Sequence, residues 1–224
     1  LHSRERITRG ELLKKVDASA SQLNALIKKG ICETLTSQIT RLDHYSGTIH
    51  KVKLNKYQEQ ALSEIQEVFK SQDVVLLHGI TSSGKTEVYI RLIEETIKQG
   101  KQVLYLLPEI ALTTQIINRL RKVFGNNVGI YHSRFNDAEK VEIWNKVLEG
   151  NLSTEVGSGF NIVLGARSAV FLPLSKPGLI IVDEEHDSSY KQYDPAPRYN
   201  ARDSAIVLAR RFGAKVVLGS ATPS

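Results

Sequence analysis

The sequence has little cysteine, no methionine and no long apolar run. Cys32 is the one cysteine in 224 residues, which excludes an internal disulfide and a cysteine metal cluster, and we expect it to be a small buried side chain. No apolar stretch is long enough to span a bilayer, and the N-terminus lacks the pattern of a cleaved leader. We therefore expect a cytoplasmic chain with no membrane partner. Because the chain starts at Leu1 without methionine, we also expect an internal fragment.

The excess positive charge lies at one end of the chain. Residues 1–56 hold 11 Lys and Arg against 5 Asp and Glu, whereas residues 57–224 hold 19 of each. A basic segment beside a neutral body favours contact with phosphate groups. The alternative is a basic surface that is merely solvated.

Residues 1–50 show a pattern of their own. We predict one helix over residues 8–16, which a Thr8–Glu11 capping box would begin. A second helix, with Leu23 on its apolar face, would end at Gly30, and a weak strand would follow over residues 31–35. Helix, turn, helix and hairpin are the outline of a winged helix. We therefore predict a partial winged-helix DNA-binding domain.

Apolar strands and amphipathic helices alternate after residue 50. Strands are predicted at residues 74–77, 103–107, 161–164, 179–182 and 215–218, and helices over residues 58–70 and after Lys85, Thr113 and Asp137. The alternation indicates an α/β fold in which helices cover both faces of a parallel sheet. Ligands of such a fold bind at the carboxyl ends of the strands. Residues 150–159 and 187–199 interrupt the alternation and are predicted to be loops.

A phosphate-binding motif follows the first of these strands. Residues 79–86 read Gly-Ile-Thr-Ser-Ser-Gly-Lys-Thr, a full match to G-x-x-x-x-G-K-T between a strand and a helix. Such a loop aims backbone N–H groups and the positive end of a helix at phosphate oxygens. Lys85 should reach the β and γ phosphates, and Thr86 should hold Mg²⁺. The predicted ATP-binding residues are Gly79, Thr81, Ser82, Ser83, Gly84, Lys85 and Thr86.

Acidic residues follow another buried strand. Residues 179–182 run directly into Asp183-Glu184-Glu185-His186. We expect Asp183 to hold Mg²⁺ and Glu184 to polarise the attacking water. Glu185 has a weaker claim, and a surface or structural role is favoured for it. His186 is either a satisfied core histidine or a residue that couples nucleotide to DNA, and its place beside the carboxylates favours coupling.

Asp183 to His186 form a DExH box, which together with the phosphate loop resembles superfamily 2 helicases. Five further segments resemble the PriA family of primosomal replication-restart DNA helicases: residues 107–113, 165–171, 183–192, 198–203 and 219–224. The resemblance spans nearly all of residues 54–224, ends at motif III and is looser over residues 1–50. It implies a RecA-like P-loop NTPase lobe over residues 51–224. The chain departs from the family at Ser82 and Ala166, where Gly and Thr are usual.

The resemblance also implies roles for individual residues. Gln58 would read the adenine edge. Trp144 fits the family pattern without an implied role, and its place on an amphipathic helix predicts a core residue. Residues implied to contact DNA are Thr113, which the pattern alone makes a helix N-cap, and Arg167, Ser168, Tyr190, Lys191, Arg198 and Tyr199. The tyrosines among them would stack on bases and the cations would lie near phosphates, the alternative being a plain surface loop. Gln192, Ser220 and Thr222 would link hydrolysis to lobe movement.

The family's activity is ATP-driven 3′→5′ unwinding at stalled forks, followed by primosome assembly. The implied cofactors are ATP and Mg²⁺. The implied partners are single-stranded and forked DNA, primosome proteins and single-strand-binding proteins, and RNA is not expected among them. The implied location is near the nucleoid. Zinc is expected only in a C-terminal part that this sequence lacks, along with the second lobe and its arginine finger. We therefore expect almost no hydrolysis by the chain alone. Two other functions are alternatives to a PriA-type helicase: a DNA-binding module, or another superfamily 2 translocase.

Overall fold

The computed structural model describes residues 12–13, 15–16, 19–31, 46–50, 52–80, 83–109, 111, 113–150 and 159–221. The chain divides into two compact units, Leu1–Thr40 and Arg41–Ser224. Several predictions fall outside the described residues: the Thr8–Glu11 capping box, Cys32, most of the strand at residues 31–35, and the roles of Thr81, Ser82 and Thr222.

The first unit contains the second helix predicted for the basic segment, α2 (Ala20–Lys28). Ser19 begins it with a capping box, because its hydroxyl accepts a hydrogen bond from the Gln22 backbone and Gln22 bonds the Ser19 backbone in return. Leu23 is buried, and Gly30 has a positive φ of 71° after the helix ends. The winged-helix domain itself stays a prediction.

The second unit is built on one parallel sheet of six strands. Its order is β1–β6–β5–β2–β4–β3. The bounds are Val74–His78 for β1, Gln102–Leu106 for β2, Val128–Tyr131 for β3, Ile162–Gly165 for β4, Pro177–Val182 for β5 and Lys215–Ser220 for β6. The predicted parallel α/β sheet is confirmed, and β3 is a strand that the sequence pattern did not predict.

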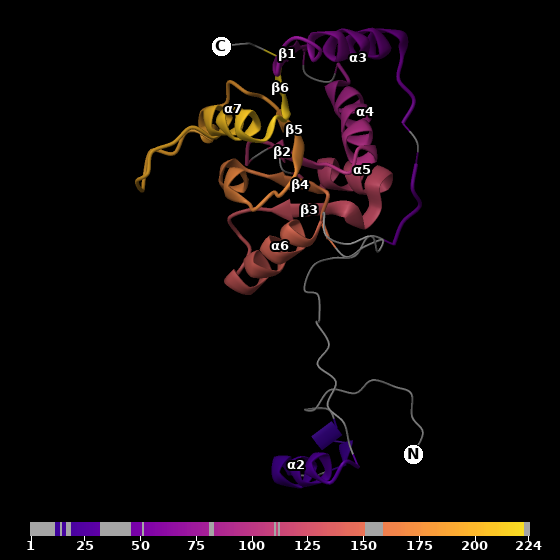
Figure 1. The fold of residues 1–224 in the computed structure, drawn as a ribbon, viewed down its shortest axis with the longest axis vertical. Helices are drawn as coiled ribbons and strands as arrows, with labels where there is room; N and C mark the ends of the chain where they lie inside the picture. Colours follow the sequence, from indigo (N-terminus) through magenta and orange to yellow (C-terminus); the bar gives the residue numbers. More distant parts are fainter. Residues whose placement is uncertain are drawn as a thin grey trace. The chain divides into compact units, whose positions relative to one another are not determined.

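Helices lie on both sides of this sheet (Figure 1). One side carries α3 (Lys56–Val68), α4 (Lys85–Lys98) and α5 (Thr114–Phe124), and the other carries α6 (Asp137–Glu149) and α7 (Ala201–Phe212). Three short 3₁₀ helices, Gly125–Asn127, Arg167–Phe171 and Ser188–Tyr190, join these elements. Asn55 and Asn136 begin α3 and α6 with capping boxes. Thr113 is the N-cap residue of α5, as predicted, although its side chain makes no capping hydrogen bond.

Alternate residues of each central strand pack into two separate cores. On β2, Val103 and Tyr105 pack on the α3–α4–α5 side, whereas Leu104 and Leu106 pack on the α6–α7 side. Each of these four side chains is fully buried. A strand buried on both faces has no polar alternation, which is why β2 and β5 appear in the sequence as continuous apolar runs.

Two sets of apolar side chains are more exposed than those of the core. The run at residues 74–77 was predicted to be an apolar strand and forms β1, which lies at an edge of the sheet, where Val74 and Leu76 are 36% and 48% exposed. Trp144 was expected in the core and is 45% exposed, because Ile143 and Val147 occupy the inner face of α6.

Candidate nucleotide site

The sheet order places three functional segments side by side. The phosphate loop follows β1, the DExH residues follow β5, and β6 lies between these two strands. Backbone hydrogen bonds join the strand ends: Gly79 N–H donates to Ser220 O at 3.0 Å and Glu185 N–H donates to Gly219 O at 2.9 Å. The carboxyl ends of the strands therefore form one continuous edge, where ligands of this fold class bind.

Lys85 lies folded across the phosphate loop. Its Nζ donates to the carbonyl oxygen of Gly79 at 2.7 Å and lies 3.6 Å from Oε1 of Glu184. Only 9% of the side chain is exposed. Gly84 begins α4 with a φ of 84°, and a Cβ there would lie 2.2 Å from Nε2 of Gln58. This position therefore favours glycine for its backbone angle, and a Cβ there would also displace the Gln58 amide.

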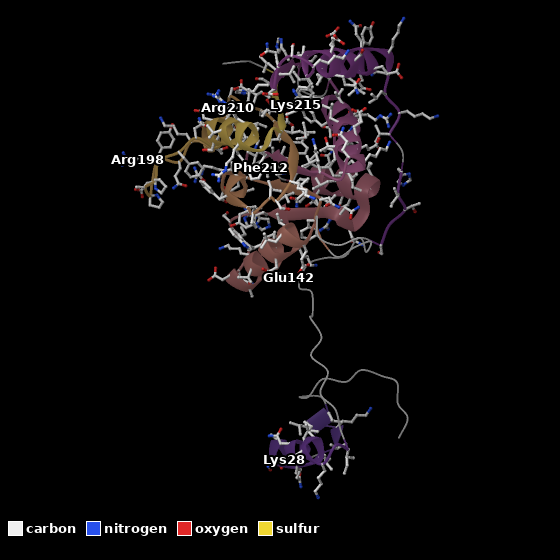
Figure 2. All side chains as sticks on the ribbon, viewed as in Figure 1. Lys28, Glu142, Arg198, Arg210, Phe212 and Lys215 are labelled. Atoms are coloured by element: carbon white, nitrogen blue, oxygen red, sulfur yellow. The ribbon has the colours of Figure 1, made fainter. Side chains whose placement is uncertain are left out.

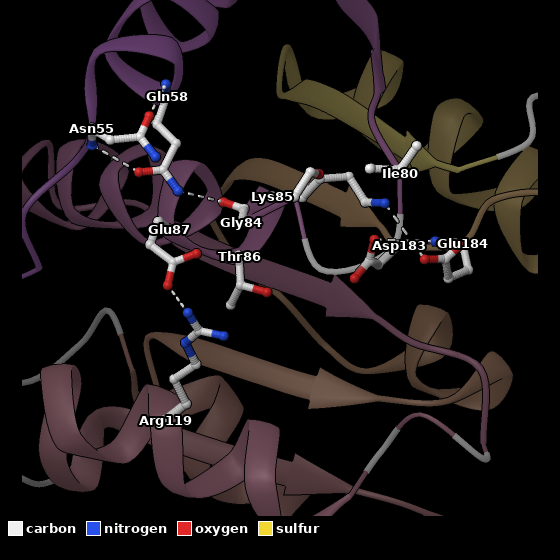
Figure 3. Close-up of a pocket in the computed structure, with 11 residues that line it drawn as sticks. Asn55, Gln58, Ile80, Gly84, Lys85, Thr86, Glu87, Arg119, Asp183 and Glu184 are labelled. Carbon is white, nitrogen blue, oxygen red and sulfur yellow. Dashed lines mark hydrogen bonds and ion pairs between the residues drawn. The ribbon is translucent and has the colours of Figure 1, made fainter.

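A cavity of about 470 Å³ opens at this edge (Figure 3). Its lining includes Ser83, Lys85, Thr86, Asp183 and Glu184, all of which the sequence motifs had singled out. The structure thus brings the phosphate loop and both acidic residues to one pocket.

Gln58 lines the same pocket, but its amide is already engaged. Its Oε1 accepts a hydrogen bond from Asn55 N–H at 2.8 Å, and its Nε2 donates to the carbonyl oxygen of Gly84 at 3.2 Å. The side chain therefore joins the start of α3 to the phosphate loop. Reading of adenine by Gln58 stays a prediction.

Two tyrosines hold the carboxylate of Asp183. Tyr89 OH donates to Oδ1 at 3.0 Å, and Tyr105 OH donates to Oδ2 at 3.2 Å. Burial is the main cause that raises the pKa of Asp183, opposed chiefly by the Tyr89 hydrogen bond. Burial, and then the charge of Asp183, raise the pKa of both tyrosines well above the ordinary value. The two hydroxyls therefore stay protonated and act as donors.

The residues after Asp183 turn sharply, since Glu184 has a positive φ of 49°. Glu185 is buried and forms an ion pair with Arg202 at 2.8 Å, which confirms the structural role favoured for it. His186 is exposed and is therefore not a core histidine. Its Nδ1 lies 2.9 Å from the hydroxyl oxygen of Ser220. Two residues assigned to coupling are thus in direct contact.

The cations predicted to contact DNA lie around the loop that precedes α7. The Arg167 guanidinium donates to the carbonyl oxygens of Ser189 at 3.4 Å and Lys191 at 2.9 Å, so it stabilises the backbone of this loop. Lys191 and Arg198 are exposed, and Figure 2 shows Arg198 in the part of this loop that projects away from α7. Tyr199 packs edge-on against Phe171 at 4.8 Å between ring centroids.

The other predicted loop residues have local roles. The Gln192 amide donates to the carbonyl oxygens of Pro195 at 2.8 Å and Pro197 at 3.1 Å, which closes the loop on itself. Ser168 is half-buried in its 3₁₀ helix, and Thr113 is exposed at the start of α5. The predicted DNA and coupling roles of these residues stay predictions.

Tyr190 requires a correction. It was expected to stack on a base, but it is fully buried, and its hydroxyl donates to the backbone oxygen of Asp183 at 2.6 Å. A ring enclosed by the core offers no face to a base. Its role in this fold is to anchor the loop beneath the acidic residues.

Comparison with known proteins settles the family. Residues 55–224 match the DEAD/DEAH box helicase family. The chain belongs to this family. It is 40% identical to the replication restart protein PriA of Bacillus subtilis (strain 168) over 98% of the chain and 27% of that protein. It is 47% identical to PriA of Helicobacter pylori (strain 26695) over 76% of the chain and 26% of that protein. The predicted resemblance to PriA is confirmed, and the chain spans about a quarter of the length of these relatives.

Solved structures share the fold at low sequence identity. The Type ISP restriction-modification enzyme LlaBIII matches 78% of the chain and 13% of its own, with a TM-score of 0.56 and 18% identity. The UvsW helicase from bacteriophage T4 matches 89% of the chain and 69% of its own, with a TM-score of 0.51 and 17% identity. These likenesses confirm the predicted α/β fold. In the described part of the chain, no helix has the length and apolarity needed to cross a membrane.

The sequence motifs did not reveal two charged residues of the pocket. Glu87 on α4 and Arg119 on α5 line the cavity and form an ion pair (Figure 3). Oε2 of Glu87 is buried without a hydrogen-bond partner among the described residues. A carboxylate directly after the phosphate loop was the available signal for Glu87, whereas nothing local in the sequence distinguishes Arg119 from other helix-surface cations.

Proposed function

We propose that this chain is the first ATP-binding lobe of a PriA-type DNA helicase, which unwinds DNA 3′→5′ at stalled forks and supports primosome assembly. The observation that supports this best is the meeting of Lys85, Thr86, Asp183 and Glu184 around one cavity. These are the groups that phosphoryl transfer from ATP requires. The PriA relatives direct the proposal to replication restart.

In this proposal, Lys85 exchanges partners when ATP binds. Its Nζ leaves the Gly79 carbonyl oxygen and Glu184 and turns to the β and γ phosphates, which carry more negative charge. The exchange frees the Glu184 carboxylate, which then orients the attacking water and accepts its proton. Lys85 is therefore paired with protein groups that the phosphates would replace.

The oxygen ligands present fit Mg²⁺, the cofactor that this chemistry uses. The Thr86 hydroxyl and the Asp183 carboxylate line the same cavity, and hard oxygen ligands are those that Mg²⁺ prefers. When bound, the ion would neutralise charge that develops on the phosphate oxygens. Thr86 and Asp183 are the residues that would hold it.

Coupling to DNA is proposed to run through His186 and Ser220. Their contact joins the acidic turn to the end of β6. A change at the γ phosphate would therefore be transmitted to β6, the strand next to β1. Single-stranded DNA would lie over the exposed residues Thr113, Lys191 and Arg198, beside Arg167, Ser168 and Tyr199. Forked DNA, primosome proteins and single-strand-binding proteins are the proposed partners of the longer protein.

The chain by itself should bind nucleotide weakly and hydrolyse it very slowly. Helicases of this kind take an arginine finger from a second lobe, and such a residue is worth about 10³ to 10⁵ in rate. Turnover at the rate of an intact helicase would contradict this part of the proposal.

Titration of a fluorescent ATP analogue with Mg²⁺ tests the proposed site. We expect saturable binding by the unaltered chain, loss of binding in Lys85→Ala, and retention in Lys98→Ala. Lys98 is a matched control, because it is an exposed lysine at the other end of the same helix. Equal binding by Lys85→Ala and the unaltered chain would show that the nucleotide does not bind at the phosphate loop.

A further inference from the structure

The carboxylate of Asp183 is held from behind by two buried hydroxyls. Tyr89 comes from α4, the helix that begins at the phosphate loop, and Tyr105 comes from β2. Both side chains are fully buried, and their rings meet edge to face at 5.6 Å between centroids. Because the rings support each other, neither hydroxyl can move away from the carboxylate without disturbing the core.

Each carboxylate oxygen receives one of these hydroxyls. Oδ1 accepts from Tyr89 OH and from Glu184 N–H at 3.2 Å, whereas Oδ2 accepts from Tyr105 OH. A carboxylate has about four acceptor positions. Among the described residues, the three bonds leave one position on Oδ2, and Asp183 lines the nucleotide cavity. The tyrosines therefore fix the direction in which the remaining acceptor points.

Gly219 shows independently that the Tyr89 hydroxyl and the Asp183 carboxylate limit which residue can stand beside them. A Cβ at this position on β6 would lie 1.8 Å from the Tyr89 hydroxyl and 2.8 Å from Oδ1 of Asp183. The hydroxyl belongs to a rigid, fully buried ring, so it could not give way cheaply. The space that the missing side chain of Gly219 leaves beside β5 is the space that the hydroxyl–carboxylate pair occupies.

We infer that Tyr89 and Tyr105 are positioning residues that set the Mg²⁺ affinity of Asp183. The inference rests on the proposed function, since it takes Asp183 as a ligand of the ion or of its bound water. Groups that orient a metal-binding side chain typically change metal affinity or activity by about 10- to 100-fold when they are removed. Neither tyrosine lines the cavity, so neither is expected to touch the nucleotide.

Removal of either hydroxyl should weaken Mg²⁺ binding without weakening the phosphate loop itself. In Tyr105→Phe, Oδ2 loses its donor and the carboxylate is held through Oδ1 alone. In Tyr89→Phe, Oδ1 keeps only the Glu184 N–H, and the carboxylate loses the donor that fixes it from α4. We expect about a tenfold rise in the half-saturating Mg²⁺ concentration for each variant. Affinity for nucleotide without Mg²⁺ should stay the same, because it depends on Lys85 and the loop backbone.

Tyr190→Phe is the matched control. Tyr190 is equally buried and also donates to Asp183, but its acceptor is the backbone oxygen, whose position the chain itself fixes. Loss of this hydroxyl should lower thermal stability as the other two variants do. It should leave the half-saturating Mg²⁺ concentration within about twofold of the unaltered chain.

The experiment measures binding of a fluorescent ATP analogue by the 224-residue chain, across a Mg²⁺ series and in EDTA. Thermal unfolding verifies that each variant is folded, and if one tyrosine variant does not fold, the other decides. The inference is supported if Tyr89→Phe or Tyr105→Phe shifts the Mg²⁺ midpoint and Tyr190→Phe does not. The inference is overturned, and the proposed function stands, if Lys85→Ala abolishes binding while the folded tyrosine variants keep the Mg²⁺ midpoint of the unaltered chain. If binding by the unaltered chain does not depend on Mg²⁺, the proposed metal site is overturned together with it.

Discussion

Replacing Arg202 with alanine should destabilise the lobe more than an ordinary surface substitution. The Arg202 guanidinium donates to Oε2 of Glu185 at 2.8 Å and also to Oδ1 of Asp203 at 3.0 Å. Only 4% of the Glu185 side chain is exposed, against 29% for Arg202. The substitution would therefore leave a carboxylate buried beside β6 without its cation.

The magnitude follows from how far water can reach the pair. Removing one partner of a fully buried ion pair costs about 3–5 kcal/mol in the free energy of unfolding. Because Arg202 is partly exposed, water can reach the space that it leaves, and we expect the lower end, about 3 kcal/mol. For a domain of this size, that corresponds to a fall in melting temperature of about 6–12 °C.

Thermal unfolding of five chains tests the reasoning: the unaltered chain, Arg202→Ala, Lys70→Ala, Glu185→Gln, and Glu185→Gln combined with Arg202→Ala. Lys70→Ala serves as the surface control, because Lys70 and Glu67 are 71% and 72% exposed, and such a pair contributes less than about 1 kcal/mol. Arg202→Ala in a Glu185→Gln background should cost only about 1 kcal/mol, because no charge is then left unpaired. The reasoning is refuted if Arg202→Ala costs no more than Lys70→Ala, or costs the same in both backgrounds.

Two further predictions concern Asp183 and the projecting loop. Burial raises the pKa of Asp183, so its contribution to stability is present below the ordinary carboxyl pKa of about 3.9 and is lost as pH rises through the raised pKa. Asp183→Asn should therefore gain melting temperature relative to the unaltered chain as pH rises above about 4 in EDTA; a difference that does not change with pH would contradict this. Arg198→Ala should weaken single-stranded DNA binding and lower the slope of log affinity against log salt by about 0.7. Salt titrations with Lys98→Ala as control measure that slope, and an unchanged slope in Arg198→Ala would exclude a phosphate contact.

The sequence predicted those parts of the site that depend on local order. The phosphate loop and the acidic turn each directly follow an apolar run, so the position of both at strand ends could be inferred without coordinates. Their meeting followed from a general property of parallel sheets. The strand order that places β6 between them could not be inferred, because pairing depends on packing between distant segments.

Elements with weak apolar signals were missed. The inner face of α7 is formed by Ala201, Ala205 and Ala209, so it lacks the stripe of large side chains by which the other helices were predicted. Strand β3 has only four residues and includes Gly129, which leaves little alternation to detect.

Side chains of the same type differ in burial, and residue type alone does not predict the difference. Tyr190 and Tyr193 lie three positions apart in one polar loop, yet Tyr190 is fully buried and Tyr193 is 61% exposed. The difference comes from the 3₁₀ helix Ser188–Tyr190, which turns the first ring beneath the acidic residues. Residue type and spacing contain no information about that turn.

The edge position of β1 has a consequence for how the chain folds during synthesis. Its neighbour in the sheet is β6, and Asp73 before β1 pairs with Lys215 at the start of β6 across 142 positions. Contacts of such long sequence separation carry a high loop-closure entropy and form late. As the chain leaves the ribosome, the strand that carries the phosphate loop has no neighbour in the sheet until β6 has been made. Nucleotide binding should therefore appear only after residue 220 has emerged, which makes it a direct signal that β6 has joined the sheet.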